Sequence, residues 1–549
     1  MHYVLPFILA MAVTMACLPM LARLAQKWLI VDQPGSRKVH STPIPRVGGL
    51  AMLLGVLIAA LAAIQLQPQD LWFLAAACVL VVFGALDDRF DLDYRVKFIG
   101  QLVAVGIVVL LGDVQIHTIT LADRVMLPGW VSLPLTVFFL VGVTNAINLA
   151  DGLDGLAGGT SLLCLCAVAL FSGIGDQGAV TALALAFAGA VLGFLRFNTY
   201  PASVFMGDAG SQLLGFSTGV LSVRATQSAG SDVSAAIPVL LLALPILDTL
   251  SVMVQRIGEG RSPFSADKNH IHHKLLALGF VHHEAVMVIY TVQAALFVLA
   301  YFLRYESDLV ILCAVTAFFI MSIAALQAGA RLGWRVRGPA AASAAAADSA
   351  LTRFLARIRQ PALLPRYSYL ALASALVAYA TLIVLEAAAF GSDIRWLVVA
   401  LFAVSVCLLL FLRSAPLSLV EKAALYVTVT VLVYLDAMVL PPDRLISVLT
   451  WTAVVVAALA AAVRLRLQSD RRFQTTPLDL IVLFMALVVP SLPGSLHLTH
   501  GGALTIAKLL VLLYSIELLI SRSDGRAVWL RVAVVSVLAG LAVRPLVPF

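Results

Sequence analysis

Two amides and two carboxylates recur at three-residue intervals between positions 145 and 155, at the end of an apolar run. The sequence there reads Asn-Ala-Ile-Asn-Leu-Ala-Asp-Gly-Leu-Asp-Gly, and its polar members are Asn145, Asn148, Asp151 and Asp154. Residues three apart on a helix lie near one face. Carboxylates can hold a metal ion, and amides can bind a base or a sugar. Because such groups are costly at membrane depth, they indicate a functional site.

Four further polar clusters interrupt the apolar sequence, and two of them are built around acids. Adjacent Asp87 and Asp88 repel each other unless a cation or a base shares them, so the pair indicates magnesium binding or proton handling. Asp208 lies between Gly207 and Gly210, in a turn where a carboxylate can reach a metal and backbone N–H groups can approach a phosphate. For Asp87 and Asp88 the alternative is a solvated helix end. For Asp208 it is an ordinary helix cap.

The two remaining clusters contain histidines and cations. The first consists of Arg37, Lys38, His40 and Arg46, and the second of Asp267, Lys268, His270, His272, His273 and Lys274. The lysine neighbours, and the lack of a nearby cysteine, favour phosphate binding or acid–base work over zinc, with a solvated loop as the alternative. Acids for a metal, cations for phosphate and amides for a base or sugar together predict a nucleotide diphosphate site at a membrane surface.

The composition predicts an all-α polytopic membrane protein. Of the 549 residues, 62% are hydrophobic and 12% are charged, and the mean hydropathy is +1.02. Apolar runs long enough to cross a bilayer as a helix recur throughout the chain. Eleven spans are predicted in its first part, at residues 3–22, 48–66, 71–86, 98–112, 131–149, 160–175, 178–195, 211–223, 236–254, 285–303 and 308–328.

The distribution of basic residues predicts how these spans are oriented. The loop after the first span contains a single acid, Asp32. It also contains five basic residues: Arg23, Lys27, Arg37, Lys38 and Arg46. The loop after the eleventh span also contains a single acid, Asp348. It contains seven arginines: Arg331, Arg335, Arg337, Arg353, Arg357, Arg359 and Arg366. Because cytoplasmic loops are enriched in Lys and Arg, both loops are predicted to be cytoplasmic. Counting alternate loops then places all five polar clusters on the cytoplasmic face.

A change in composition divides the chain into three parts. Residues 1–330 form a membrane-embedded domain that carries the five clusters, and residues 331–366 form an Arg-, Ala- and Pro-rich cytoplasmic linker. Residues 367–549 are predicted to form a C-terminal membrane domain with about seven further spans and a role that the sequence leaves open. Its isolated acids Glu386, Asp436 and Glu517 are expected to be hydrogen-bond partners between helices.

Several other residues are expected to have mainly structural roles. Asp248, inside the ninth span, is expected to make a buried hydrogen bond between helices, and indirect support of the histidine cluster is the alternative. His282 and His283 are expected to be ordinary loop residues. The six cysteines lie inside apolar runs, where they are expected to pack as small apolar residues without a disulfide or zinc.

In the order and spacing of these motifs the sequence resembles the polyprenyl-phosphate N-acetylhexosamine-1-phosphate transferases. The resemblance covers about residues 1–330. It rests on five segments: Arg37–His40, Asp87-Asp88, Asn145–Gly155, Gly207–Ser211 and His270–His273. The His-Ile-His-His form is similar to the branch that transfers GlcNAc 1-phosphate, the WecA and TagO type. The branch that makes the first peptidoglycan lipid usually has three consecutive histidines, and this sequence departs from that.

The resemblance implies a reaction and its location. N-acetylhexosamine 1-phosphate, with GlcNAc as the expected sugar, would pass from a UDP-sugar to undecaprenyl or another polyprenyl phosphate, giving a lipid diphosphate sugar and UMP. This step would initiate cell-envelope polysaccharide synthesis, such as that of O-antigen, at the cytoplasmic face of the bacterial inner membrane. The expected cofactor is Mg²⁺, with Mn²⁺ as the alternative. The expected partners include the lipid bilayer but not nucleic acid. A homodimer, and further partners that bind through the C-terminal membrane domain, stay open.

The resemblance also implies roles for individual residues. Asp208, together with Asp151, would ligate the metal ion, and Asp87 or Asp88 would handle the lipid phosphate. The histidines with catalytic roles would be His270, His272 and His273. The side chains that bind substrate would be Lys38, His40, Lys97, Asn145, Asn148 and Asp154, the last of them near the uridine.

Several alternatives remain at this level. The sequence contains no Gly-Lys-Ser/Thr loop, which argues against an ATP-driven pump. A secondary transporter is the rival class, although it is expected to carry its ionisable groups near the bilayer midplane. The sugar, including GalNAc, a 6-deoxy amino sugar or MurNAc-pentapeptide, stays open. So do the pathway and the choice between direct attack and double displacement.

Overall fold

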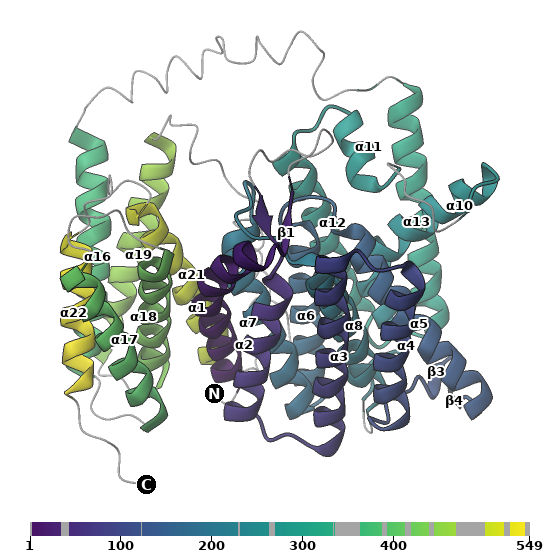
Figure 1. Ribbon diagram of the computed structural model, residues 1–549, viewed down its shortest axis with the longest axis horizontal. Coiled ribbons are helices and arrows are strands. Elements are labelled where there is room, and N and C mark those ends of the chain that lie inside the picture. The colour runs from purple at the N-terminus through teal and green to yellow at the C-terminus, as the bar shows by residue number, and fades with distance from the viewer. Residues whose placement is uncertain are drawn as a thin grey trace. The chain divides into compact units, whose positions relative to one another are not determined.

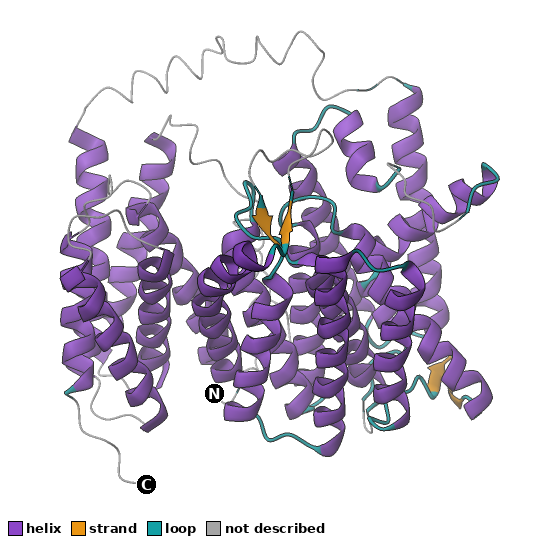
Figure 2. Ribbon diagram, viewed as in Figure 1, coloured by secondary structure: helices purple, strands orange, loops and turns teal. Residues whose placement is uncertain are grey.

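The computed structural model describes residues 3–33, 43–121, 123–228, 231–262, 269–332, 334, 363–386, 392–411, 419–438, 444–467, 500–520 and 528–543. The chain divides into two compact units, the first containing helices α1 to α13 and the second helices α16 to α22. Within each unit the helices pack against one another, and strands are few and short (Figures 1 and 2).

Ten of the eleven predicted spans of the first part each correspond to one helix, and the ninth corresponds to two. The helices of the first unit are α1 (Val4–Trp28), α2 (Gly48–Ala63), α3 (Pro68–Phe90), α4 (Tyr94–Leu110), α5 (Gly129–Ala150), α6 (Leu156–Ile174), α7 (Gly178–Asn198), α8 (Gly207–Gln227), α9 (Ile237–Leu241), α10 (Ala243–Gly258), α11 (Ile271–Ala277), α12 (His282–Leu303) and α13 (Asp308–Arg331). Eight described helices, seven of them here, are long and apolar enough to cross a membrane. The fold is therefore that of an all-α polytopic membrane protein.

The ninth predicted span differs from a continuous helix because it is divided at Leu242 into α9 and α10. Pro245 explains the break, since its ring lacks an N–H and clashes with the carbonyl four residues earlier, that of Leu241. The Leu241 carbonyl instead accepts a hydrogen bond of 2.8 Å from Nε2 of Gln293 on α12. The break allows α10 to leave the direction of α9 and carry Asp248 towards the histidine cluster.

Helix α8 lies in the core of the first unit although it is one of its least apolar helices. Every residue from Ala209 to Gln227 is buried. Small residues allow this close packing, and the hydroxyls of Ser222 and Thr226 donate to carbonyls of their own helix, which satisfies them without a partner helix. The N-terminal turn of this central helix contains Asp208, so the packing of α8 positions the acid.

Backbone pairing ties the start of α2 to the start of α8. Strands β1 (Val31–Asp32) and β2 (Ile44–Pro45) form an antiparallel pair with Val31 opposite Pro45. The chain after β2 then pairs with residues 205–206: Phe205 N–H donates to the Pro45 carbonyl (2.8 Å) and Gly49 N–H to the Met206 carbonyl (3.0 Å). Strands β3 (Thr118–Thr120) and β4 (Arg124–Met126) lie at the opposite end of this unit (Figure 1).

The second unit is also a helical bundle. Its described helices are α16 (Leu363–Glu386), α17 (Ser392–Phe411), α18 (Leu419–Met438), α19 (Arg444–Leu467), α21 (His500–Ile520) and α22 (Val528–Ala542). About seven spans were expected here; part of that region, like most of the 331–366 linker, lies outside the described residues.

Interhelical polar contacts join the helices of the second unit. The carboxylate of Asp436 on α18 accepts from the hydroxyl of Tyr379 on α16 (2.9 Å) and from Nζ of Lys508 on α21 (2.6 Å). Glu421 on α18 and Arg531 on α22 form a second buried pair at 2.6 Å. The expectation that Asp436 is a hydrogen-bond partner between helices is confirmed.

Candidate active site

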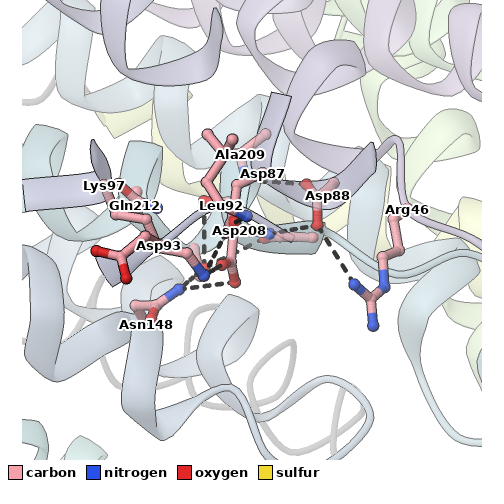
Figure 3. Close-up of polar contacts among 12 residues, drawn as sticks. Arg46, Asp87, Asp88, Leu92, Asp93, Lys97, Asn148, Asp208, Ala209 and Gln212 are labelled. Atoms are coloured by element: carbon pink, nitrogen blue, oxygen red, sulfur yellow. Dashed lines mark hydrogen bonds and ion pairs between the residues drawn. The ribbon is translucent and has the colours of Figure 1, made fainter. Parts of the chain in front are cut away.

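The N-terminal turn of α8 places Asp208 at the centre of a group of polar side chains (Figure 3). Gly207, which begins this turn, has a φ of 69°, a conformation that L side chains rarely adopt. A Cβ at this position would lie 2.2 Å from Oδ2 of Asp88, so space as well as conformation requires glycine. The Gly-Asp-x-Gly-Ser motif is thus a helix start that brings its carboxylate close to the end of α3.

Asp88 caps that helix start from outside. Its Oδ1 accepts the Asp208 N–H at 2.9 Å and its Oδ2 accepts the Ala209 N–H at 3.1 Å (Figure 3). The N-terminal N–H groups of a helix have no partner within the helix and carry partial positive charge, which a carboxylate satisfies. With both oxygens engaged and a guanidinium nitrogen of Arg46 at 3.9 Å, Asp88 holds the turn in place.

Lys97 connects the two acids that flank this cap. Its ammonium lies 2.6 Å from Oδ2 of Asp87 and 3.1 Å from Oδ2 of Asp208. The other oxygen of Asp87 accepts the Leu92 N–H at 2.8 Å. Adjacent residues on a helix point about 100° apart, which explains why Asp87 faces α4 while its neighbour Asp88 faces α8. The predicted roles of Asp87, Asp88 and Lys97 towards substrate stay predictions, and the structure gives all three a positioning contact.

The two asparagines of the motif differ in what they contact. Nδ2 of Asn148 donates to Oδ1 of Asp208 (3.1 Å) and to Oγ of Ser211 (2.7 Å). Asn145, one turn earlier, donates instead to Oε1 of Gln101 at 2.7 Å, and Gln101 donates to Oε1 of Gln212 at 3.2 Å. Asn148 therefore belongs to the Asp208 site, whereas the amide of Asn145 joins α5 to α4 and α8.

Gln101 and Gln212 were not singled out from the sequence. Each is buried, with 3% of its surface exposed, and each lies on a helix next to the site. Isolated glutamines within membrane-spanning helices are rare for the same reason as isolated acids, and that was the signal available in the sequence.

Asp151 follows α5 and is surrounded by other acids. Although solvent reaches this side chain, the protein around it limits hydration of the carboxylate. This desolvation, together with the nearby charges of Asp208, Asp154 and Asp88, raises the pKa of Asp151 to about 7. Such a carboxylate gains from a cation that neutralises it, which is the electrostatic setting expected of a metal ligand.

Asp154, at the other end of the loop, is held by hydrogen bonds to neighbouring segments of the protein. Its Oδ2 accepts the Ala202 N–H at 2.9 Å, and its own N–H donates to Nε2 of His282 at 3.1 Å. The ring of His282 in turn stacks on Tyr200, with centroids 4.7 Å apart. The interpretation of His282 and His283 as ordinary loop residues is therefore wrong: both lie in the first turn of α12, and His282 contacts the motif that opens at Asn145.

The histidine cluster packs against the same loop. His270 and His272 are buried, and a Cβ at Gly152 would lie 2.4 Å from Cε1 and Nε2 of His272. Burial, and to a lesser extent His273, lowers the pKa of His272 to about 4. The ring of His272 is therefore neutral at pH 7 and does not supply positive charge for a phosphate.

The contact between Gly152 and His272 supports a prediction. Gly152→Ala places a methyl group where the imidazole now lies, which must displace the ring and the Asp151–Asp154 loop. We expect about a tenfold loss of kcat, because a small misplacement of catalytic groups costs that much or more. Gly142→Ala on the preceding helix α5, where a Cβ meets nothing within 4 Å, is the control. Equal turnover by the two variants would contradict this reading of the loop.

Some predicted site residues lie outside the described part of the chain. These are Lys38 and His40 of the first cluster and Asp267 and Lys268 of the last. Five of the predicted residues that the structure describes form one contact network: Asp87, Asp88, Lys97, Asn148 and Asp208. Asp151 lies close enough for the charges of Asp208 and Asp88 to raise its pKa. His272 and His282 join the Asp151–Asp154 loop to the histidine segment.

The donor groups suit a hard cation that is held partly by substrate. Among the described residues no group of three or more His, Cys, Asp or Glu side chains is arranged to hold an ion. Asp208 and Asp151 offer carboxylate oxygens, and the side chain of Asp208 is 33% exposed. Mg²⁺ typically takes one or two carboxylates and completes its shell with phosphate oxygens and water. The residues present therefore fit Mg²⁺ shared with a diphosphate.

Comparisons with known proteins agree with this geometry. A model of the family described as glycosyl transferase family 4 matches residues 71–226. The probable undecaprenyl-phosphate N-acetylglucosaminyl 1-phosphate transferase of Bacillus subtilis is 39% identical over 292 residues, which are 53% of this chain and 81% of that protein. The decaprenyl-phosphate N-acetylglucosaminephosphotransferase of Mycobacterium leprae is 38% identical over 302 residues, 49% of this chain and 75% of the relative.

A third relative extends the comparison to enterobacteria. The undecaprenyl-phosphate alpha-N-acetylglucosaminyl 1-phosphate transferase of Escherichia coli K12 is 34% identical over 281 residues, 50% of this chain and 76% of the relative. All three relatives are named as transferases of a phosphorylated N-acetylglucosamine that act with a polyprenyl phosphate. The chain belongs to glycosyl transferase family 4 and is an enzyme of the polyprenyl-phosphate N-acetylglucosamine-1-phosphate transferase type.

Proposed function

We propose that this enzyme transfers GlcNAc 1-phosphate from UDP-GlcNAc to undecaprenyl phosphate, releasing UMP, as the initiating step of a cell-envelope polysaccharide. The observation that carries the proposal is the network around Asp208, where Asn148, Lys97 and the Asp88 cap hold one carboxylate at a helix start. Such a site suits a metal-bound diphosphate. The names of the relatives support the lipid acceptor and the sugar.

The proposed location is the cytoplasmic face of the bacterial inner membrane. The basic loop after α1 and the arginine-rich region after α13 are the segments expected on the cytoplasmic side. The site lies at the same end as the first of these loops, because Arg46 pairs with Phe205 next to the Asp208 turn. A UDP-sugar made in the cytoplasm would reach the site directly.

The chemistry favours direct attack by the lipid phosphate on the β-phosphorus of the donor. The second pKa of a phosphate monoester is near 6, so at neutral pH the nucleophile is mostly ionised and a general base has little to remove. Asp87 and Asp88 accept hydrogen bonds at both oxygens, which suits positioning better than nucleophilic attack. These contacts support direct transfer over a double displacement through either of these aspartates.

The principal barrier is then the approach of one anion to another. Asp208 and Asp151 would hold Mg²⁺, or Mn²⁺ as the alternative, which supplies charge neutralisation and alignment of the phosphates when bound. Lys97 contacts and orients one oxygen of Asp208, and Asn148 donates to the other oxygen of the same carboxylate. The loop from Asp151 to Asp154 would face the nucleotide part of the donor.

Product release from defined substrates tests the proposal. Purified protein in detergent, incubated with UDP-GlcNAc, undecaprenyl phosphate and Mg²⁺, is expected to release UMP and form a lipid-linked sugar. Omission of the lipid or chelation of the metal should abolish release. UDP-GalNAc, a UDP-6-deoxy amino sugar and UDP-MurNAc-pentapeptide form the comparison panel, with UDP-GlcNAc expected to be turned over fastest. No UMP release with any donor would refute the proposal and favour a transporter.

A further inference from the structure

The geometry points to Asp248 as a positioning residue that acts through His270, holding the imidazole by Nδ1 so that Nε2 is the nitrogen presented to the phosphate or sugar of the substrate. This inference rests on the proposed function, because it assigns a task within the same site. Asp248 lies on α10, after the Pro245 break, and it contacts the start of α11.

Two hydrogen bonds define how Asp248 holds the histidine segment. Its Oδ2 lies 2.8 Å from Nδ1 of His270, and its Oδ1 accepts the N–H of Ile271 at 2.6 Å. Both Asp248 and His270 are buried, with 6% of each residue exposed. The carboxylate therefore holds both the ring of His270 and the backbone next to it, and rotation of the ring would break a buried bond.

The acceptor character of Asp248 decides which ring nitrogen bears a hydrogen. A carboxylate oxygen accepts hydrogen bonds, so we assign the hydrogen of the bond between the two side chains to Nδ1 of His270. The other ring nitrogen, Nε2, has no hydrogen-bond partner among the residues that the structure describes. The His270 ring is parallel to that of His272 to within 6°, with centroids 5.8 Å apart. Because His272 lies on Gly152 beside Asp151, this stacking places the His270 ring next to the proposed diphosphate site.

The two buried histidines therefore have different tasks. His272 stays neutral because burial lowers its pKa to about 4, and its ring supports the Asp151–Asp154 loop. His270 is held by a carboxylate, an arrangement that orients a ring towards a ligand on its other side. Asp248 thus acts on the reaction only through the orientation and protonation pattern of His270.

Asp248→Asn is the informative variant because an amide offers one acceptor instead of two. If Oδ1 keeps the Ile271 N–H, Nδ2 faces Nδ1 of His270 as a donor and forces the ring proton onto Nε2. We expect about a 30-fold loss of kcat, in the range of outer-shell substitutions, with little change in KM for the UDP-sugar. His270→Gln in the same full-length enzyme is expected to lose at least as much.

A double-mutant cycle separates positioning from a structural role. In the His270→Gln background, adding Asp248→Asn should change kcat by less than about threefold, because the residue through which Asp248 acts is already gone. Asp308→Asn is the matched control: Asp308 is a buried acid that accepts the N–H groups of Thr120 and Ala236 at the opposite end of the unit. Its effect should be the same in both backgrounds. A 30-fold loss for Asp248→Asn in both backgrounds would overturn the inference.

A spectroscopic measurement tests the same point without turnover. In protein labelled with 15N-histidine, the resonances lost in His270→Gln identify this ring. Its Nδ1 should bear hydrogen between pH 6 and 9 in the unaltered protein, and hydrogen should move to Nε2 in Asp248→Asn at pH 9. An Nε2-protonated neutral ring in the unaltered protein would overturn the inference. If the unaltered protein releases no UMP, the proposed function fails. The 15N measurement would still test whether Asp248 determines which nitrogen of His270 bears hydrogen.

Discussion

Asp208→Asn is expected to reduce transfer of GlcNAc 1-phosphate by about a thousandfold at saturating Mg²⁺, which corresponds to about 4 kcal/mol of transition-state stabilisation. Asparagine keeps the size of the side chain and one oxygen, so the contact from Asn148 at Oδ1 can persist. The charge that attracts both Lys97 and a metal ion is lost. Initial rates of UMP release over a Mg²⁺ titration measure the effect.

Two comparisons make this result specific. Asp93→Asn is the control, because Asp93 caps α4 through the Arg95 N–H and asparagine caps equally well. Its activity should match that of the unaltered enzyme. At pH 8 the loss for Asp208→Asn should exceed that for Asp87→Asn, since the lipid phosphate is already ionised there. Comparable losses for the two variants at pH 8 would contradict the proposal that metal binding contributes more to the rate than a general base does.

Lys97→Met is expected to lower kcat/KM by about a hundredfold and also to lower the unfolding midpoint in detergent. Methionine has a similar length but leaves Asp87, whose side chain is 3% exposed, without its cation. Removing one partner of a fully buried pair costs about 3–5 kcal/mol, and the partial exposure of Lys97 reduces this to about 2 kcal/mol. Asp208 also loses the ammonium that orients it, which accounts for the loss of rate.

Arg95→Met and a double variant test the cause of these losses. Arg95 is an exposed basic residue on the same helix turn, and its Nε contacts the hydroxyl of Tyr94 instead of an acid. Its replacement should leave activity and the unfolding midpoint unchanged. Combining Lys97→Met with Asp87→Asn removes the uncompensated charge and should restore stability without restoring the rate. An unchanged midpoint for Lys97→Met would contradict the view that Asp87 depends on Lys97.

The sequence predicted the long helices of the first unit well, but it did not predict the break in the ninth span. Long apolar runs determine spans by themselves, because a bilayer requires every backbone group to be bonded within the helix. The interruption at Leu242 follows from Pro245, whereas hydropathy alone predicts a continuous ninth span. Helix α8 shows the opposite limit: its small and hydroxylated residues give weak hydropathy, and only its place between other helices shows it as core.

The roles within the site were less accessible from the sequence. Asp87 and Asp88 are neighbours, yet one pairs with Lys97 and the other caps α8, because successive side chains on a helix face different partners. Asn145 and Asn148 lie one turn apart, yet only Asn148 contacts Asp208, while Asn145 contacts Gln101. The local sequence around His282 predicts an ordinary loop residue, because nothing in it shows that the ring contacts the N–H of Asp154.

By itself, the sequence determined the class of protein and the residue types available to it: a polytopic membrane enzyme with acidic, amide and basic side chains gathered at the ends of its spans. These properties depend on residue type and on periodicity along one helix, which are local. Only the tertiary structure decided which acid caps a helix and which acid pairs with a lysine. The contacts of Asp208 with Asp88, Lys97 and Asn148 join residues far apart in the chain, and the packing of α3, α4 and α5 around α8 determines them.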